Sequence, residues 1–309
     1  NDTWDSLTLF SPAKYSSLPG KPFSINANHY PSKQDVLEYL RNYENHYSFP
    51  VIRPIQVIGV NKSVDGIFKI TTDKEVYFSK SIIAATGTYR SPFIPKIDGL
   101  EKFSGEQLHS SAYRNAGEFI GKNVLVVGEG NSGAQIMAEL ANVTLTFWAV
   151  RKPPYFLPPE VDGKVLFDQA SAIYYAQKTG ENTDNKKMHL GNIVLLPAVK
   201  AAKNRGDFDQ YKVLKSATKN GIYWEDDSFE SIDAIIWSTG FNYHTDYLNQ
   251  LVEMDARGRV ELSESNEAEQ CPGLFFVGFG NWTGFASATL IGVGRTARKV
   301  VKELENRLT

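Results

Sequence analysis

The chain is poor in cysteine, in net charge and in long apolar runs. One cysteine, Cys271, stands among 309 residues, which excludes a disulfide framework or a Cys-x-x-Cys redox centre within the chain and is typical of a reducing cytoplasm. The 33 basic and 35 acidic residues give a net charge of -2, so neither nucleic acid nor an anionic membrane is an expected partner. No apolar run reaches membrane-spanning length. An apolar content of 42% and a charged content of 22% are ordinary for a soluble globular enzyme.

Glycine is concentrated where it is most informative. Residues 128–133 read Gly-Glu-Gly-Asn-Ser-Gly and follow a short apolar, β-branched strand expected over 122–127. A helix expected over 134–141 and a second strand over 143–150 complete a βαβ unit. The amino terminus of such a helix favours a phosphate group. The segment therefore predicts a dinucleotide site.

Each glycine of this fingerprint has a separate expected role. Gly128 makes the tight turn, Gly130 lets the backbone approach the pyrophosphate, and Gly133 lets the helix pack closely on the strand. Asn131 and Ser132 lie between the glycines at the expected start of the helix. All five residues are candidates for contact with the nucleotide.

The end of the second strand indicates which nucleotide binds. An NAD site usually places Asp or Glu about twenty residues after the first glycine, to hold the ribose 2′-hydroxyl. That region holds Arg151 and Lys152 and no carboxylate. A guanidinium and an ammonium suit a 2′-phosphate, so we expect NADPH. The alternative interpretation is a solvated basic turn.

Two further apolar segments end in the same dipeptide. Residues 81–85 lead to Thr86-Gly87, and residues 233–237 lead to Ser238-Thr239-Gly240. In open α/β sheets, cofactors bind at the carboxyl ends of the strands. We therefore expect an α/β fold in which both Thr-Gly turns line cofactor sites.

The rest of the chain indicates an antiparallel insertion and two further helices. Apolar spacing predicts a helix over 35–43 with Ser32 as its N-cap, and a final helix from about Ser287. Strands are expected over 51–60, 67–72 and 76–78. Residues 153–210 are rich in Pro and aromatic side chains and are the expected substrate-facing region, with a polar loop over 178–187.

The segment 103–113 has the form F-x-G-x-x-x-H-x-x-x-Y, with His109 at its centre. This pattern resembles the identifying motif of class B flavin-dependent monooxygenases, and Tyr113 suggests the flavin-containing monooxygenase branch. Further similar segments are 5–7, 15–20, 30–32, 85–88, 238–241 and 272–278. Residues 280–290 look most like the ArsO-type flavoproteins encoded in arsenic-resistance operons.

The resemblance implies a mechanism that uses FAD, NADPH and O2. NADPH reduces FAD, the reduced flavin reacts with O2 to a C4a-(hydro)peroxyflavin, and one oxygen atom passes to a small soft nucleophile. His109 and Ser11 are the candidate catalytic residues, although Ser11 stands where related enzymes often have asparagine. Beyond the fingerprint, the expected cofactor contacts are Arg151, Lys152, Thr239, Gly240, Leu18, Pro19, Tyr30, Val57, Ala85, Thr86, Gly87, Gly278, Trp282, Thr283 and Gly284.

The family has two Rossmann-like domains, for FAD and for NADPH. We expect residues 1–112 and 240–309 to form the FAD-binding domain and residues 113–239 the NADPH-binding domain. The first glycine fingerprint of the family, which serves FAD, is not found in this sequence, so an N-terminal FAD βαβ unit is expected to be missing from the chain as printed. No metal site is expected, and a homodimer is left open.

Other functions compete with monooxygenation. A thioredoxin-reductase-like disulfide reductase shares the architecture but needs a redox cysteine pair. An uncoupled NADPH oxidase would make peroxide without product, and a truncated chain would be a non-catalytic nucleotide-binding fragment. A role in arsenic resistance faces a chemical difficulty, because trivalent arsenic prefers several thiolates and the chain offers only Cys271.

Overall fold

A computed structural model describes residues 3–24, 26–159, 161, 165, 167–168, 172 and 192–308. The chain forms two compact units. Unit 1 comprises Asn1–Ala13, Ala27–Val36 and Pro92–Gly240, and unit 2 comprises Lys14–Asn26, Leu37–Ser91 and Phe241–Thr309. The expected polar loop over 178–187 lies outside the described residues, and most of the expected substrate-facing region does too.

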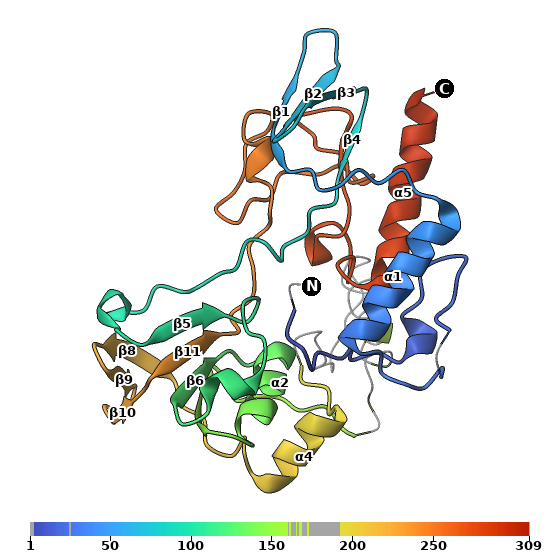
Figure 1. Cartoon of the computed structure of the whole chain (residues 1–309). Coiled ribbons are helices and arrows are strands. Elements are labelled where there is room, and N and C mark those ends of the chain that lie inside the picture. Colours follow the sequence, from blue (N-terminus) through green and yellow to red (C-terminus); the bar gives the residue numbers. More distant parts are fainter. Residues whose placement is uncertain are drawn as a thin grey trace. The chain divides into compact units, whose positions relative to one another are not determined.

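Unit 1 is built on a four-stranded parallel sheet (Figure 1). Its order is β5 (Glu106–His109), β11 (Ala234–Trp237), β6 (Asn123–Val127) and β7 (Leu145–Ala149). The helix α2 (Asn131–Leu140) connects β6 to β7, as the glycine fingerprint predicts. The compact units differ in their boundaries from the expected domains, because β5 hydrogen-bonds to β11 and so brings residues before 113 into unit 1.

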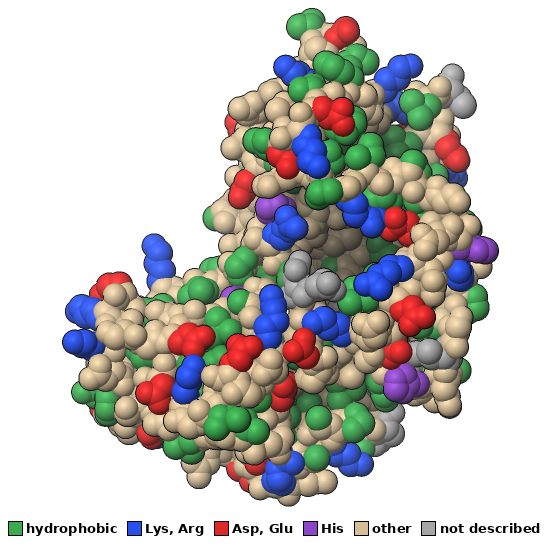
Figure 2. Space-filling view, viewed as in Figure 1, with side chains coloured by type: hydrophobic (Ala, Val, Ile, Leu, Met, Phe, Trp, Pro, Cys, Tyr) green, Lys and Arg blue, Asp and Glu red, His purple; other side chains and the backbone are tan. Residues whose placement is uncertain are grey.

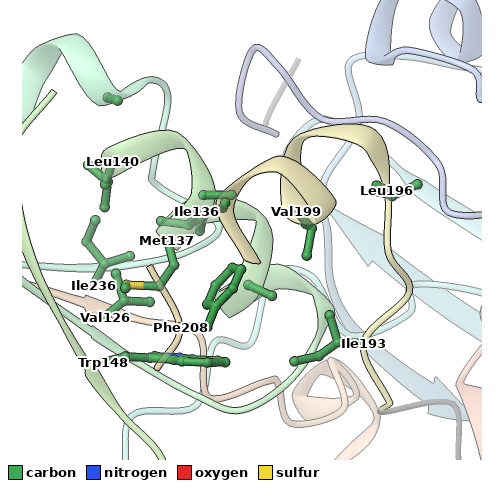
Figure 3. Packing of buried hydrophobic residues seen from close by; sticks show 14 of the residues in the cluster. Val126, Ile136, Met137, Leu140, Trp148, Ile193, Leu196, Val199, Phe208 and Ile236 are labelled. Carbon is green, nitrogen blue, oxygen red and sulfur yellow. The ribbon is translucent and has the colours of Figure 1, made fainter. Parts of the chain in front are cut away.

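One face of this sheet is covered by helices. Side chains of β6 and β11 such as Val126 and Ile236 pack against α2 and against α4 (Pro197–Arg205). Figure 3 shows Trp148 and Phe208 closing this core beneath Met137. Alternate residues point to opposite faces of a strand, so these strands are apolar on both sides.

The other face is covered by a small antiparallel sheet that the sequence did not predict. It consists of β8 (Leu214–Thr218), β9 (Gly221–Trp224) and β10 (Phe229–Ser231), in the order β10-β9-β8. Leu125 and Trp237 pack against Ile222 and Trp224 of this sheet. Strands of three to five residues carry too little alternation to be recognised from sequence.

Unit 2 contains two small sheets. The first is antiparallel, in the order β1 (Val57–Lys62), β2 (Phe68–Thr72) and β3 (Val76–Ser79). The second pairs β4 (Ile82–Ala84) with β12 (Leu274–Phe276) in parallel. The helix α5 (Leu290–Leu308) follows at the carboxyl end. Short 3-10 helices span Ala13–Tyr15, Leu100–Lys102, Ala116–Phe119, Asp246–Leu248 and Gly280–Trp282.

The predicted first helix is confirmed and is longer than expected. It is α1 (Lys33–Tyr47), which begins in unit 1 and ends in unit 2. The predicted cap at Ser32 is also confirmed, because its hydroxyl accepts the Asp35 N–H at 3.2 Å and its backbone N–H donates to the Asp35 carboxylate at 2.8 Å. This reciprocal bonding satisfies N–H groups that the helix itself leaves free. It also lowers the pKa of Asp35.

Two predicted boundaries are wrong. The strand expected over 51–60 begins only at Val57, because Pro54 lacks the N–H that a sheet ladder uses. The final helix begins at Leu290 rather than near Ser287, because residues 286–289 form a turn in which the Thr289 N–H donates to the Ala286 carbonyl at 3.0 Å.

Surface properties agree with the balanced composition. Acidic and basic side chains are interspersed over the face shown in Figure 2. In the part of the chain that the structure describes, no helix combines the length and apolar character needed to cross a membrane.

Candidate functional site

A cavity of about 460 Å³ opens at the carboxyl ends of the unit 1 strands. It is lined by the ends of β6, β7 and β11, by the segment before η2 (Leu100–Lys102), and by the start of β8. The lining residues are Phe93, Pro95, Ile97, Val127, Gly128, Glu129, Gly130, Ala149, Val150, Arg151, Val213, Leu214, Ser238, Thr239 and Gly240. Five of the predicted cofactor residues therefore meet at one cavity: Gly128, Gly130, Arg151, Thr239 and Gly240.

Two glycines of the fingerprint are packed too tightly to be replaced by a residue with a side chain. A Cβ on Gly128, whose φ is 134°, would lie 2.3 Å from the carbonyl oxygen of Ser238. A Cβ on Gly133 would lie 2.3 Å from the carbonyl oxygen of Gly128. The first turn of α2 therefore approaches the end of β6 closely, and its free N–H groups are available to an anion.

A polar group without a partner lies beside this turn. The Ser238 hydroxyl is buried and has no hydrogen-bond partner within the described protein. Ser238 lines the cavity and contacts the position where a Gly128 side chain would stand. A buried hydroxyl without a partner costs free energy, and a polar ligand in the cavity would remove that cost. The residues present thus fit a dinucleotide.

Of the two predicted 2′-phosphate residues, Arg151 is the one that lines the cavity. The Arg151 side chain is 86% exposed, and its guanidinium lies 3.3 Å from a Glu129 carboxylate oxygen. The other Glu129 oxygen accepts the backbone N–H of Arg151 at 3.4 Å. Lys152 is exposed and is not among the lining residues.

His109 is hydrogen-bonded to the Thr-Gly turn that follows β11. Its Nδ1 accepts the N–H of Ser111 at 3.2 Å, so its Nε2 carries the proton and donates to the carbonyl of Gly240 at 2.9 Å. Burial lowers the pKa of His109, although the bond to Gly240 opposes this shift. The imidazole is therefore neutral at pH 7, with both nitrogens engaged. The Thr239 hydroxyl adds a bond to the Phe93 carbonyl.

Other predicted residues of unit 1 lie outside the cavity lining. The Asn131 side chain joins α2 to a neighbouring segment, donating to the Asn192 carbonyl at 2.8 Å and accepting from Val194 N–H at 2.9 Å. Ser132 is half-buried on the first turn of α2. Tyr30 packs against the helix-covered core, and Ser11 is half-buried.

The last residue of the His109 motif has a packing position. Tyr113 is fully buried and stacks on Phe119 with ring centroids 5.8 Å apart. Burial, with the nearby Glu139 carboxylate, raises the pKa of its phenol.

In unit 2, predicted residues gather at the carboxyl edge of the parallel pair β4–β12. Ala85, Thr86 and Gly87 follow β4, and Gly278 follows β12. Gly87 and Gly278 have φ values of 65° and 85°, and a Cβ on either would meet nothing within 4 Å. These turns leave backbone open to a ligand, which fits the expected FAD contact at this edge.

The remaining predicted residues are engaged within unit 2. The Trp282 indole donates to the Val260 carbonyl at 3.1 Å, and the Thr283 hydroxyl lies 2.6 Å from that of Ser287. Val57 packs against the unit 2 core. A Cβ on Gly284, whose φ is 132°, would lie 3.0 Å from the Thr296 hydroxyl. Leu18 and Pro19 line a groove beside α5.

Similarities to known proteins show the family to which the chain belongs. A family profile described as pyridine nucleotide-disulphide oxidoreductase matches residues 11–152. A flavin-containing monooxygenase from Stenotrophomonas maltophilia has a TM-score of 0.86 and 36% identity, covering 100% of this chain and 87% of that one. The chain belongs to the flavin monooxygenase family.

Two sequence relatives are similar over nearly the whole chain. The uncharacterized oxidoreductase CzcO of Bacillus subtilis (strain 168) is 32% identical, over 98% of this chain and 87% of that protein. The probable indole-3-pyruvate monooxygenase YUCCA4 of Arabidopsis thaliana is 28% identical, over 98% of this chain and 79% of that protein. As a flavin monooxygenase homologue, the chain is an oxidoreductase that uses FAD and NADPH.

The structure adds site residues that sequence reasoning missed. Glu129 places a carboxylate beside Arg151 from within the glycine turn. Phe93, Pro95 and Val213 form apolar walls of the cavity. Glu129 was visible inside the fingerprint, whereas no sequence signal connects Phe93 with Val213.

Proposed function

We propose that the unit 1 cavity binds NADPH and that the enzyme transfers one oxygen atom from O2 to a small soft nucleophile. The observation that supports this most strongly is the convergence of Gly128, Gly130 and Arg151 at one cavity, together with a buried Ser238 hydroxyl that has no hydrogen-bond partner among the described residues. The bound flavin would supply the redox and oxygen chemistry. The protein residues bind, orient and exclude water.

The residues of the cavity have distinct parts in this proposal. The N–H groups at the start of α2 bind the pyrophosphate, and Arg151 binds the 2′-phosphate. Neutral His109 acts as a positioning residue, because its Nε2–H holds the Gly240 carbonyl and so fixes the turn beside the cavity. In unit 2, the open backbone at Gly87 and Gly278 binds FAD.

Ser11 is the second candidate catalytic residue. It carries a hydroxyl and no obligate charge, so its part would be a hydrogen bond to a reacting group. An alanine at this position should change the ratio of product to peroxide and leave NADPH binding unaltered.

An arsenic substrate would arrive as a thiol conjugate, bind weakly, or share cysteines between subunits. The single thiol, Cys271, is buried, and burial raises its pKa. A thiol of raised pKa is a poor metal ligand at pH 7. A role in arsenic resistance therefore stays a prediction from the resemblance.

Anaerobic addition of NADPH to the flavin-loaded protein tests the proposal. Bleaching of the flavin absorbance, faster with NADPH than with NADH, is the expected result. Admission of O2 with a soft nucleophile such as a thioether should then give the oxygenated product. A flavin that NADPH leaves oxidised would refute the proposal, and peroxide without product would favour the uncoupled NADPH oxidase.

A further inference from the structure

Glu129 and Arg151 form an ion pair at the mouth of the cavity. Glu129 stands between the first two glycines of the fingerprint, and Arg151 follows β7. One carboxylate oxygen lies 3.3 Å from the guanidinium, and the side chain of Glu129 is 30% exposed against 86% for Arg151. The carboxylate is therefore the better-held partner of the pair.

The position of the carboxylate does not depend on the guanidinium alone. The second oxygen of Glu129 accepts the backbone N–H of Arg151 at 3.4 Å. This contact places a negative charge at the carboxyl end of β7, where a dinucleotide site that prefers NAD has its acidic residue. Here the charge comes from the glycine turn rather than from the strand end.

The two side chains favour different nucleotides. A carboxylate accepts a hydrogen bond from a ribose 2′-hydroxyl and repels a 2′-phosphate, whereas a guanidinium binds the phosphate. Arg151 can bind a phosphate either while it remains paired with Glu129 or after this ion pair has broken. Both alternatives reduce the affinity for the phosphorylated nucleotide.

We infer that Glu129 is a specificity-determining residue that limits the preference for NADPH over NADH. The inference rests on the proposed nucleotide-binding function of the cavity. It assigns the fingerprint glutamate a role in choosing the nucleotide, in addition to the turn that its neighbouring glycines make.

Two nucleotide fragments test this role without flavin chemistry. Adenosine 2′,5′-bisphosphate carries the 2′-phosphate, and 5′-AMP lacks it. Isothermal titration of the full chain with each fragment gives the affinity ratio, which is the affinity for the bisphosphate divided by the affinity for 5′-AMP. The ratio is measured for the wild type and for Glu129→Gln. We expect Glu129→Gln to bind the bisphosphate about 3- to 10-fold more tightly, since one repelling charge is removed near the surface. Binding of 5′-AMP should stay unchanged or weaken about twofold.

Matched variants separate charge from shape. Glu129→Asp keeps the charge and should leave the affinity ratio near that of the wild type. Glu118→Gln removes an exposed carboxylate of unit 1 that does not line the cavity, and should also leave the ratio unchanged. The gain in Glu129→Gln should shrink as salt is raised, because salt screens exposed charges.

The outcomes distinguish the two proposals. A ratio that stays the same or falls in Glu129→Gln overturns the role of Glu129, and a fall would mean that Glu129 instead holds Arg151 ready for the phosphate. If the wild type binds neither fragment, the nucleotide-binding function of the cavity fails, and the role of Glu129 fails with it.

Discussion

The two Thr-Gly turns have the same sequence and different surroundings. Both glycines have positive φ, 65° at Gly87 and 82° at Gly240, and both lie in open space. Each threonine hydroxyl donates to the carbonyl of a segment distant in sequence, Thr86 to His244 at 2.6 Å and Thr239 to Phe93. The local device is therefore the same in both units.

The strands that deliver these turns differ. The strand β11 is paired on both sides and all four of its residues are buried. In the described part of the chain, β4 pairs only with β12, and Ile83 is 43% exposed. The turn after β11 lines the cavity and its Thr239 is half-buried, whereas Thr86 is exposed. Whether a Thr-Gly turn lines a cavity therefore depends on the sheet to which its strand belongs.

The largest expected effect comes from alanine at the tightest glycine. Gly128→Ala should cost about 3 kcal/mol or more of unfolding free energy, because its Cβ would meet the Ser238 backbone oxygen at 2.3 Å. Gly87→Ala meets nothing within 4 Å, so it should cost only the ~1–2 kcal/mol of a left-handed residue. Urea unfolding measures both. Equal losses would show that the packing at Gly128 is not rigid.

The next largest difference should be in the stability cost of substitutions within the two strands, β11 and β4. Ile236→Ala removes a fully buried side chain of β11 and should cost about 2–5 kcal/mol. Ile83→Ala on β4 should cost less than about 1 kcal/mol, since the residue is 43% exposed. Ile236→Val is the conservative control, expected at about 0.5–1.5 kcal/mol. A cost at Ile83 as large as that at Ile236 would contradict the difference drawn between the strands.

Arginines near the two turns should differ in nucleotide recognition. Arg151→Ala should raise the KM for NADPH about tenfold or more and change that for NADH little, because only NADPH carries the phosphate that a guanidinium binds. Arg90, which follows the unit 2 turn, is the matched control, and Arg90→Ala should leave both KM values unchanged. Equal effects of Arg151→Ala on the two nucleotides would refute the phosphate role.

The smallest effect concerns pH. Burial lowers the pKa of His109 from the ordinary value of 6.5, so the unfolded chain binds the proton more readily than the folded one. The contribution of neutral His109 to the free energy of unfolding is thus present above pH 6.5 and is lost as the pH falls below this value. His109→Gln does not titrate, so the stability gap between wild type and variant should narrow from pH 7.5 to pH 5.5. A constant gap in urea unfolding would contradict this assignment.

Much of unit 1 was predictable from local patterns. The glycine spacing predicted β6, α2 and β7, and the apolar run predicted β11, because each signal lies within one short segment. The order β5-β11-β6-β7 was not predictable, since β11 pairs with β5 and β6, which lie more than a hundred positions before it. The 3-10 helices and the sheet β8–β10 were missed for their shortness.

The candidate site was predicted in part for the same reason. The glycines, Arg151 and the Thr239-Gly240 turn were identified from motifs, and the structure brings them to one cavity. His109 was identified, yet its bond to Gly240 was not. The functional assignment of the two domains stays a prediction.

By itself, the amino-acid sequence determined the chemistry that the chain carries: a glycine fingerprint, basic residues after a strand, and a single cysteine. These follow from residue type and spacing along the chain. Only the tertiary structure decided that a glutamate inside the fingerprint lies 3.3 Å from the arginine that follows the next strand. The physical reason is that a parallel sheet brings the carboxyl ends of its strands to one edge. Charged side chains that are distant in sequence lie close enough there to interact.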